Sequence, residues 1–213
     1  MDRVLEKAQA DVLALRERIP QLDHSSLDLI FREARSFNGW QDRPVAEKLL
    51  RQLYELVKIG PTSANCQPAR FLFLRTSAAK ERLRPALAPG NVDKTMNAPV
   101  IAIIGYDIGF VDRLKDLFPH KDMTGMFRGN STLIESTAFR NSTLQGAFLI
   151  IAARALGLDT GPMSGFDNKK VDAEFFSEST ITSNFLCNIG YGDEKSLFSR
   201  SPRLPFEDAC EFL

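Results

Sequence analysis

The sequence predicts a single α+β domain with an appendage at its N-terminus. The chain has 213 residues, a length typical of one domain. Hydrophobic residues make up 44% and charged residues 25%, which is sufficient for a normal core. Helical and strand patterns mix without the regular βα alternation of a doubly wound sheet. We therefore expect an N-terminal helical extension over residues 1–22 and one domain over residues 23–213.

Three helices are expected before the first strand. Residues 2–18 carry apolar side chains at helical spacing, and Pro20 ends that helix. Residues 25–37 begin with two serines, which are suited to capping a helix N-terminus. Residues 46–60 place leucine and valine on one face, and Gly60 suits the left-handed position after the helix end.

Three strands and two short helices follow. Residues 70–76 alternate in hydrophobicity and are rich in phenylalanine, which predicts a strand. Residues 99–107 form a continuous apolar run, which is typical of a buried central strand. Residues 183–192 form the last strand. Short amphipathic helices are expected over 77–87 and 111–118.

The longest helix is expected over residues 133–157. Its second half is apolar on nearly every face, which indicates burial all round and a subunit interface as well as a core. Residues 121–132 are polar with two glycines and predict a mobile loop. A further helix is expected over 166–176.

Charge and residue counts exclude several classes of protein. Lys+Arg and Asp+Glu both number 27, and no long basic run is present, so nucleic acid and anionic membranes are poor partners. The longest apolar run, 146–153, is too short to span a bilayer, and no signal region follows Met1. Three separated cysteines favour a reduced, cytoplasmic chain. With only two histidines, His24 and His120, no metal site is expected.

Four polar segments are candidates for holding a ligand. The loop "GPTSANCQPARF", residues 60–71, is dense in neutral hydrogen-bonding groups and has no charge before Arg70. Residues 34–40 and 200–205 supply arginines, which suit phosphate. Residues 157–167 contain three glycines, which allow a flat ligand to approach the backbone. Together these groups suit a phosphorylated heterocycle, and a bound cofactor would then carry the chemistry.

Five pieces of sequence resemble one known family. They are "ARSFNGW", "PVAEKLLRQLYELVKIGPTSANCQPARFLFL", "NVDKTMNAPVIAI", "LGLDTGPMSGFD" and "NIGYGD" with the later "PRLPFE". In this order they resemble the FMN-dependent nitroreductase superfamily over about residues 25–213. "NGW", "GPTSANC", "ESTAFRN" and "LGLDTGPMSGFD" are most similar to its RutE-like branch, the malonic semialdehyde reductases of pyrimidine degradation.

The resemblance implies the fold, the cofactors and the partner. The fold is a nitroreductase-like mixed β-sheet flanked by helices, in an intertwined homodimer. FMN is the cofactor and NAD(P)H the co-substrate. Two FMN sites lie at the dimer interface, and each is built from both subunits.

The resemblance also implies which residues hold FMN. Ser63 and Asn65 reach the flavin of the other subunit, and Asn141 is an amide from that same partner. Lys94 places a cation near N1 and O2 of the flavin, where it stabilises the reduced anionic form. The backbone of Ser164 and Gly165 lies near N5, and no catalytic side chain is assigned. The full set is Arg35, Ser36, Asn38, Thr62, Ser63, Asn65, Asn91, Lys94, Asn141, Pro162, Met163, Ser164, Gly165 and Arg203.

Two departures from the family pattern concern the phosphate. The positions on either side of Arg35 and Ser36 that are usually basic hold Ala34 and Asn38. Two positions before Arg203, where the family usually has a basic residue, this sequence has Ser201. We therefore expect a less cationic phosphate site than in typical members of the family.

The expected activity is ping-pong hydride transfer that reduces malonic semialdehyde to 3-hydroxypropionate. Such a substrate needs a cation for its carboxylate, supplied by Arg140 or by a residue of 107–132. One alternative is a broad-specificity nitro or quinone reductase, since Ala69 leaves room for flat acceptors. The other is a non-catalytic flavin-binding or structural dimer.

Overall fold

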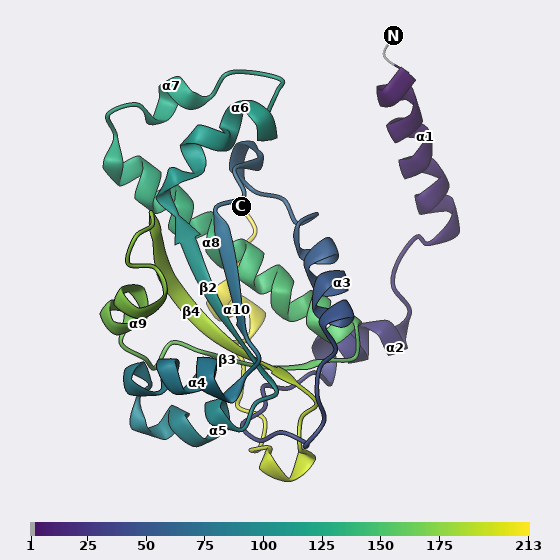
Figure 1. Cartoon of the computed structure of the whole chain (residues 1–213). Coiled ribbons are helices and arrows are strands. Elements are labelled where there is room, and N and C mark those ends of the chain that lie inside the picture. The colour runs from purple at the N-terminus through teal and green to yellow at the C-terminus, as the bar shows by residue number, and fades with distance from the viewer. Residues whose placement is uncertain (1–2) are drawn as a thin grey trace.

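The computed structural model describes residues 3–213, so the first residue of the predicted helix 2–18 lies outside the described residues. Its four-stranded sheet has the order β1-β2-β4-β3. The strands are β1 (Ala69–Leu74), β2 (Val100–Asp107), β3 (Asp159–Met163) and β4 (Ile181–Gly190). The helices are α1 (Arg3–Arg18), α2 (His24–Leu27), α3 (Glu47–Val57), α4 (Ser77–Leu83), α5 (Val92–Met96), α6 (Leu114–Leu117), α7 (Thr124–Phe127), α8 (Ser131–Ala155), α9 (Asn168–Phe175) and α10 (Phe206–Ala209). The α+β class is therefore confirmed (Figure 1).

The pairing within the sheet differs from a mixed sheet. All three ladders of the described chain are antiparallel. The parallel pairing found in residues 3–213 is an isolated bridge between Ser36 and Thr160. Strand β3 was not expected, because Gly161 and Pro162 are poor strand formers. Pro162 is tolerated there because β3 is the edge strand of the sheet, and the isolated bridge on its other side is at Thr160, not at Pro162.

Strand β2 is buried on both of its faces, as its apolar run predicts. Val100, Ala102 and Ile104 pack with α3 and α8 on one face. Ile101 and Ile103 pack with α4 and α9 on the other. Because successive side chains of a strand point to opposite faces, β2 contributes to two separate hydrophobic cores, and helices cover both sides of the sheet.

Helix α8 crosses the sheet as one long element, as predicted. In its second half, the part expected to be buried in the core and in a subunit interface, Leu149 lies in the core, while Phe148 and Ile150 are half-buried within one chain. In its first half, Phe139 is 49% and Leu144 46% exposed. Apolar composition alone did not show which face would meet the sheet. The exposed apolar side chains leave this face of α8 open to a partner.

Three local expectations were wrong. The second helix is capped by Asp23, whose carboxylate accepts from the Ser26 backbone N–H, and it ends in a π-helical turn over Asp28–Arg32. Gly60 has no positive φ; its role is a close approach, since a Cβ there would lie 2.3 Å from the ring of Phe148. The loop 121–132 contains α7, whose Phe127 packs edge-on against Phe110 with ring centroids 5.2 Å apart.

Helix α1 stands apart from the rest of the molecule. Figure 1 shows it beyond α2, joined to the body by a short linker. None of its residues is buried. Among residues 3–213, no helix is long and apolar enough to cross a membrane.

Candidate functional site

The predicted site residues fall into two groups at opposite ends of the sheet. The loop 61–67 lies at the Asp107 end of β2, since the Asp107 backbone N–H donates to the carbonyl of Pro68 at 2.9 Å. Lys94 lies on α5, just before the Val100 end of the same strand. Seven residue steps separate these ends, or about 23 Å at the usual rise of a strand. Figure 1 shows the same separation, with α6 at the top and α5 at the bottom.

The loop 61–67 has an unusual backbone conformation. Ala64, Asn65 and Gln67 have φ angles of 47°, 49° and 39°, in the left-handed region. Such strain persists only where surrounding contacts hold it, and it is concentrated at functional sites. Asn65 Nδ2 donates to the Leu117 carbonyl at 2.8 Å, and the Gln67 backbone N–H donates to Thr62 Oγ1 at 3.2 Å. The loop is therefore built in one conformation by its own polar side chains.

Asn141 on α8 fixes the start of this loop. Its Oδ1 accepts from the Ser63 backbone N–H at 2.8 Å, and its Nδ2 donates to the Thr137 carbonyl at 2.8 Å. The side chain is 3% exposed. This geometry positions Ser63, whose hydroxyl has no partner among residues 3–213. A direct contact between Asn141 and FMN stays a prediction.

We expect Asn141→Ala to destabilise the protein by roughly 1–2 kcal/mol, because it leaves the Ser63 N–H without its acceptor. The measurement is the urea midpoint at constant m value. Ser136→Ala is the matched control on the same helix, since the Ser136 hydroxyl only donates to the Leu133 carbonyl on an exposed face. Equal midpoints for the two variants would contradict the positioning role of Asn141.

At the other end of the sheet, three predicted segments meet. Lys94 Nζ donates to Asn38 Oδ1 at 3.3 Å, which joins α5 to residues 34–40. Asn91 Nδ2 donates to the Gly165 carbonyl at 2.8 Å, which joins α5 to the segment after β3. Lys94 has no carboxylate partner in the described chain. Its charge is therefore available to an anionic ligand.

The segment after β3 has the donors expected beside a flat ligand. Within residues 3–213, the backbone N–H groups of Ser164 and Gly165 have no protein acceptor. A Cβ on Gly165 would lie 2.4 Å from Asn91 Nδ2, so glycine is required for the close approach of the two segments. The Met163 side chain is positioned by Thr95 Oγ1, which donates to its sulfur at 3.4 Å. Two free amides beside a cation and an amide side chain fit the edge of a flavin ring.

The phosphate candidates lie on two segments, residues 34–40 and the C-terminal segment, which contact each other through other residues. Arg35 donates to the carbonyl of Phe198, which ties residues 34–40 to the C-terminal segment. Arg200 lies 3.9 Å from Glu33, which further joins the two segments. Arg203 is exposed, and among the described residues its guanidinium donates to the nearby carbonyls of Ser201 and Pro202. Arg35, Ser36 and Arg203 therefore remain the phosphate candidates, with Asn38 turned to Lys94.

Three supporting residues were not predicted as part of the site. Trp40 Nε1 and Asn188 Nδ2 both donate to the Lys94 carbonyl, at 2.9 and 3.2 Å. Gln145 Oε1 accepts from the Ala69 backbone N–H at 2.9 Å and holds the start of β1 beside the loop. A signal existed for the two amides, since each interrupts an otherwise apolar run in a strand or a helix.

The Cys66 thiol and the two histidines have structural roles. Burial raises the pKa of the Cys66 thiol to about 11, so it stays protonated at neutral pH and acts as a packing residue, as expected. His24 begins α2 and contacts Arg32. His120 packs edge-on against Phe118 with ring centroids 5.4 Å apart. In the part of the chain that the structure describes, no three metal-binding side chains form a cluster.

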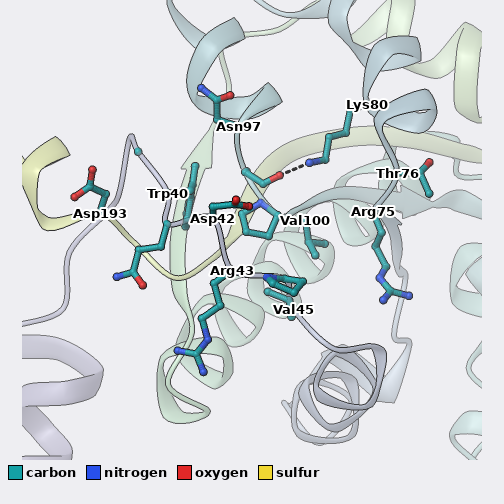
Figure 2. Close-up of a pocket in the computed structure, with 15 residues that line it drawn as sticks. Trp40, Asp42, Arg43, Val45, Arg75, Thr76, Lys80, Asn97, Val100 and Asp193 are labelled. Atoms are coloured by element: carbon teal, nitrogen blue, oxygen red, sulfur yellow. Dashed lines mark hydrogen bonds between the residues drawn. The ribbon is translucent and has the colours of Figure 1, made fainter.

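A cavity of about 1000 Å³ lies beside the Lys94 end of the sheet (Figure 2). Residues 39–45, Arg75 and the segment before β2 line it. Lys80 donates to the carbonyl of Ala98 in its wall, and burial lowers the pKa of this lysine. None of the predicted FMN-binding residues lines this cavity, so volume alone would have pointed away from the predicted site.

The fold matches solved structures of one class of oxidoreductase. One is an Exiguobacterium sibiricum protein described as a "putative nitroreductase in complex with FMN", with a TM-score of 0.79 and 21% identity over 91% of this chain and 99% of the other. Another is a nitroreductase family protein of Streptococcus pneumoniae, with a TM-score of 0.77 and 22% identity over 88% of this chain and 99% of the other. These similarities define the fold.

The sequence comparisons define the family. The nitroreductase family model matches residues 32–191. Proteins of Burkholderia lata and Cupriavidus pinatubonensis, both described as "Putative NADH dehydrogenase/NAD(P)H nitroreductase", are 59% and 58% identical over 187 and 188 residues. These matches cover 88% and 87% of this chain and 96% of each relative. The chain therefore belongs to the nitroreductase family of oxidoreductases.

Proposed function

We propose that this chain is an FMN-dependent NAD(P)H oxidoreductase that acts as a homodimer with shared FMN sites. The observation that carries the proposal is the separation of the two groups of site residues. Ser63 and Lys94 are both expected around one flavin ring, where hydrogen-bond partners lie within about 3 Å. Because about 23 Å of strand separates their ends of the sheet, one chain cannot place both on one ring. A second copy supplies the missing group.

Each group then has a separate task. Lys94 provides a positive charge beside the pyrimidine part of the flavin, and the amides of Ser164 and Gly165 bind the ring edge. The partner's loop 61–67 presents the Ser63 hydroxyl. Bound FMN supplies hydride transfer between NAD(P)H and an acceptor. The exposed apolar face of α8, including Phe139 and Leu144, supplies surface for the dimer.

The proposed acceptor is malonic semialdehyde, which is reduced to 3-hydroxypropionate. A cavity of about 510 Å³ lies beside the loop 61–67 and is lined by Gln67, Arg70 and Arg113. Arg70 is paired with Asp107 at 2.6 Å, whereas Arg113 has no acidic partner in the described residues. Arg113 is therefore our candidate in 107–132 for binding the substrate carboxylate.

The cofactor and the acceptor are tested by absorption spectroscopy of the purified protein. Flavin bands that bleach on anaerobic addition of NADPH and return with malonic semialdehyde support both halves of the proposal. Recovery with nitrofurazone or menadione but not with the aldehyde would instead support the nitro or quinone reductase. A protein that shows no flavin bands after reconstitution with FMN would overturn the proposed function.

The shared site is tested by subunit complementation. Lys94→Gln and Ser63→Ala chains with different tags are co-expressed, and the mixed dimer is isolated. If each site takes Lys94 from one chain and Ser63 from the other, one site of the mixed dimer carries both substitutions and the other is intact. The expected activity is about half that of the wild-type dimer. A mixed dimer no more active than the average of the two variants would exclude sharing.

A further inference from the structure

Helix α1 has an apolar seam with the spacing of a coiled coil. Leu5, Ala8, Val12, Leu15 and Ile19 follow one another at intervals of three and four residues. They are exposed, with fractions of 52% for Leu5, 46% for Val12, 49% for Leu15 and 48% for Ile19. Helical bonding extends to Ile19, whose N–H donates to the Leu15 carbonyl at 2.8 Å. The seam is thus continuous over the whole helix and is covered by no part of the described chain.

We propose that α1 pairs with α1 of a second copy of this chain as a parallel two-stranded coiled coil. In the heptad that the seam defines, Leu5 and Val12 occupy a positions, and Ala8 and Leu15 occupy d positions. Alanine at one d position allows the two helices to approach closely. The pairing lies outside the flavin site and rests on the association of two chains in the proposed dimer.

Charge complementarity supports the parallel pairing. Asp11 falls at a g position and Arg16 at the following e position, and these positions of two parallel helices face each other. A symmetric pair of helices therefore forms two Asp11–Arg16 contacts. Arg16 has no ion-pair partner in residues 3–213, while Asp11 contacts Lys7 of its own helix at 2.6 Å and retains acceptor capacity. An antiparallel pair would face g with g and e with e, which places Asp11 opposite Arg18 instead, so the response to substitution of Arg16 distinguishes the two directions.

A membrane surface is a poor fit, because α1 has mixed charges and no aromatic residue.

A helix of 16 residues is only marginally stable alone in water. Pairing becomes favourable when the bodies of two chains already associate, because tethering raises the effective concentration of one helix near the other. The proposal therefore predicts a pairing that is weak for the isolated peptide and strong in the full chain.

The first test is disulfide cross-linking in the full chain. Cys210 is the exposed cysteine, while Cys66 and Cys187 are buried, so the background is Cys210→Ser. Ala8→Cys places two thiols at facing d positions, within the distance that a disulfide spans. Ala10→Cys is the matched control, since position 10 is an f position on the outer face. We expect Ala8→Cys to cross-link at least about tenfold faster than the control.

The second test exchanges the charges in the Ala8→Cys background. Asp11→Arg and Arg16→Asp each place like charges together and are expected to slow cross-linking about three- to tenfold. The double variant restores opposite charges and is expected to restore the rate. The NADPH-dependent flavin spectrum is recorded for each variant and should not change.

Equal cross-linking rates at positions 8 and 10 would overturn the pairing. If Ala8→Cys cross-links fast but the double charge exchange does not restore the rate lost in the single variants, the parallel register is wrong. Co-sedimentation of the protein with phosphatidylglycerol vesicles, lost on Leu15→Asp while cross-linking stays slow, would assign the seam to a membrane instead.

Discussion

Replacing Lys94 by glutamine is expected to slow NADPH-dependent flavin reduction by roughly 10²-fold, the usual effect of removing one electrostatic stabiliser. The ammonium group contacts Asn38 Oδ1 at 3.3 Å and no acid within residues 3–213, so its charge is available to stabilise an anionic flavin. The fold should tolerate the change, because the carbonyl of Lys94 holds Trp40 and Asn188 regardless of its side chain. Anaerobic stopped-flow absorbance measures the rate.

Lys48→Gln is the matched control for this prediction. Lys48 lies exposed on α3 and is not one of the predicted site residues, so its replacement should leave the rate unchanged. The midpoint potential of the bound flavin provides a second readout, and Lys94→Gln should lower it because the reduced anion loses a cation. Wild-type rate and potential in Lys94→Gln would remove Lys94 from the proposed site.

Replacing Gly161 by alanine is expected to reduce the free energy of unfolding by roughly 1–3 kcal/mol. A Cβ at this position would lie 2.6 Å from the carbonyl oxygen of Phe37 and 3.3 Å from the Trp40 ring. The first contact is with backbone, which cannot rotate away. Relief of the clash moves residues 34–40 from β3, so FMN affinity should fall as well. Thermal unfolding and a fluorescence titration with FMN measure the two effects.

Gly90→Ala serves as the control, because no atom lies within 4 Å of the position where its Cβ would be, and its φ is not positive. We expect a change within about 0.5 kcal/mol for this variant. If Gly161→Ala unfolds at the same temperature as Gly90→Ala, β3 and residues 34–40 do not pack as closely as the structure shows.

Most secondary structure followed from patterns that are local in the sequence. The apolar run before Asp107 predicted a central strand, and β2 is buried on both faces. The long apolar segment after Asn130 predicted the single helix α8. Strand β3 was missed, because its Gly-Pro pair disfavours a strand and only the neighbouring β4 makes it one. Gly60 was assigned to a helix end, although the ring of Phe148, far along the chain, determines the need for glycine.

The candidate site was predicted as a set of residues but not as an arrangement. Motifs pointed to Asn91, Lys94 and Gly165 by resemblance, and in the structure side-chain hydrogen bonds join Asn91 to Gly165 and Lys94 to residues 34–40. Asn38 stands where the family usually has a cation, and its bond to Lys94 was not predictable from either residue alone. The burial of Asn141 was likewise invisible, because it depends on how α8 packs against the loop 61–67.

The sequence by itself determined the α+β class, the principal strands, the long helix and the nitroreductase resemblance, because periodicity and motif order are local properties that survive in any packing. Only the tertiary structure decided which residues meet. It placed Ser63 and Lys94 at opposite ends of one strand, and it left the seam of α1 uncovered. Contacts between distant segments depend on the sum of many weak packing and hydrogen-bond terms, and no single stretch of sequence contains that sum.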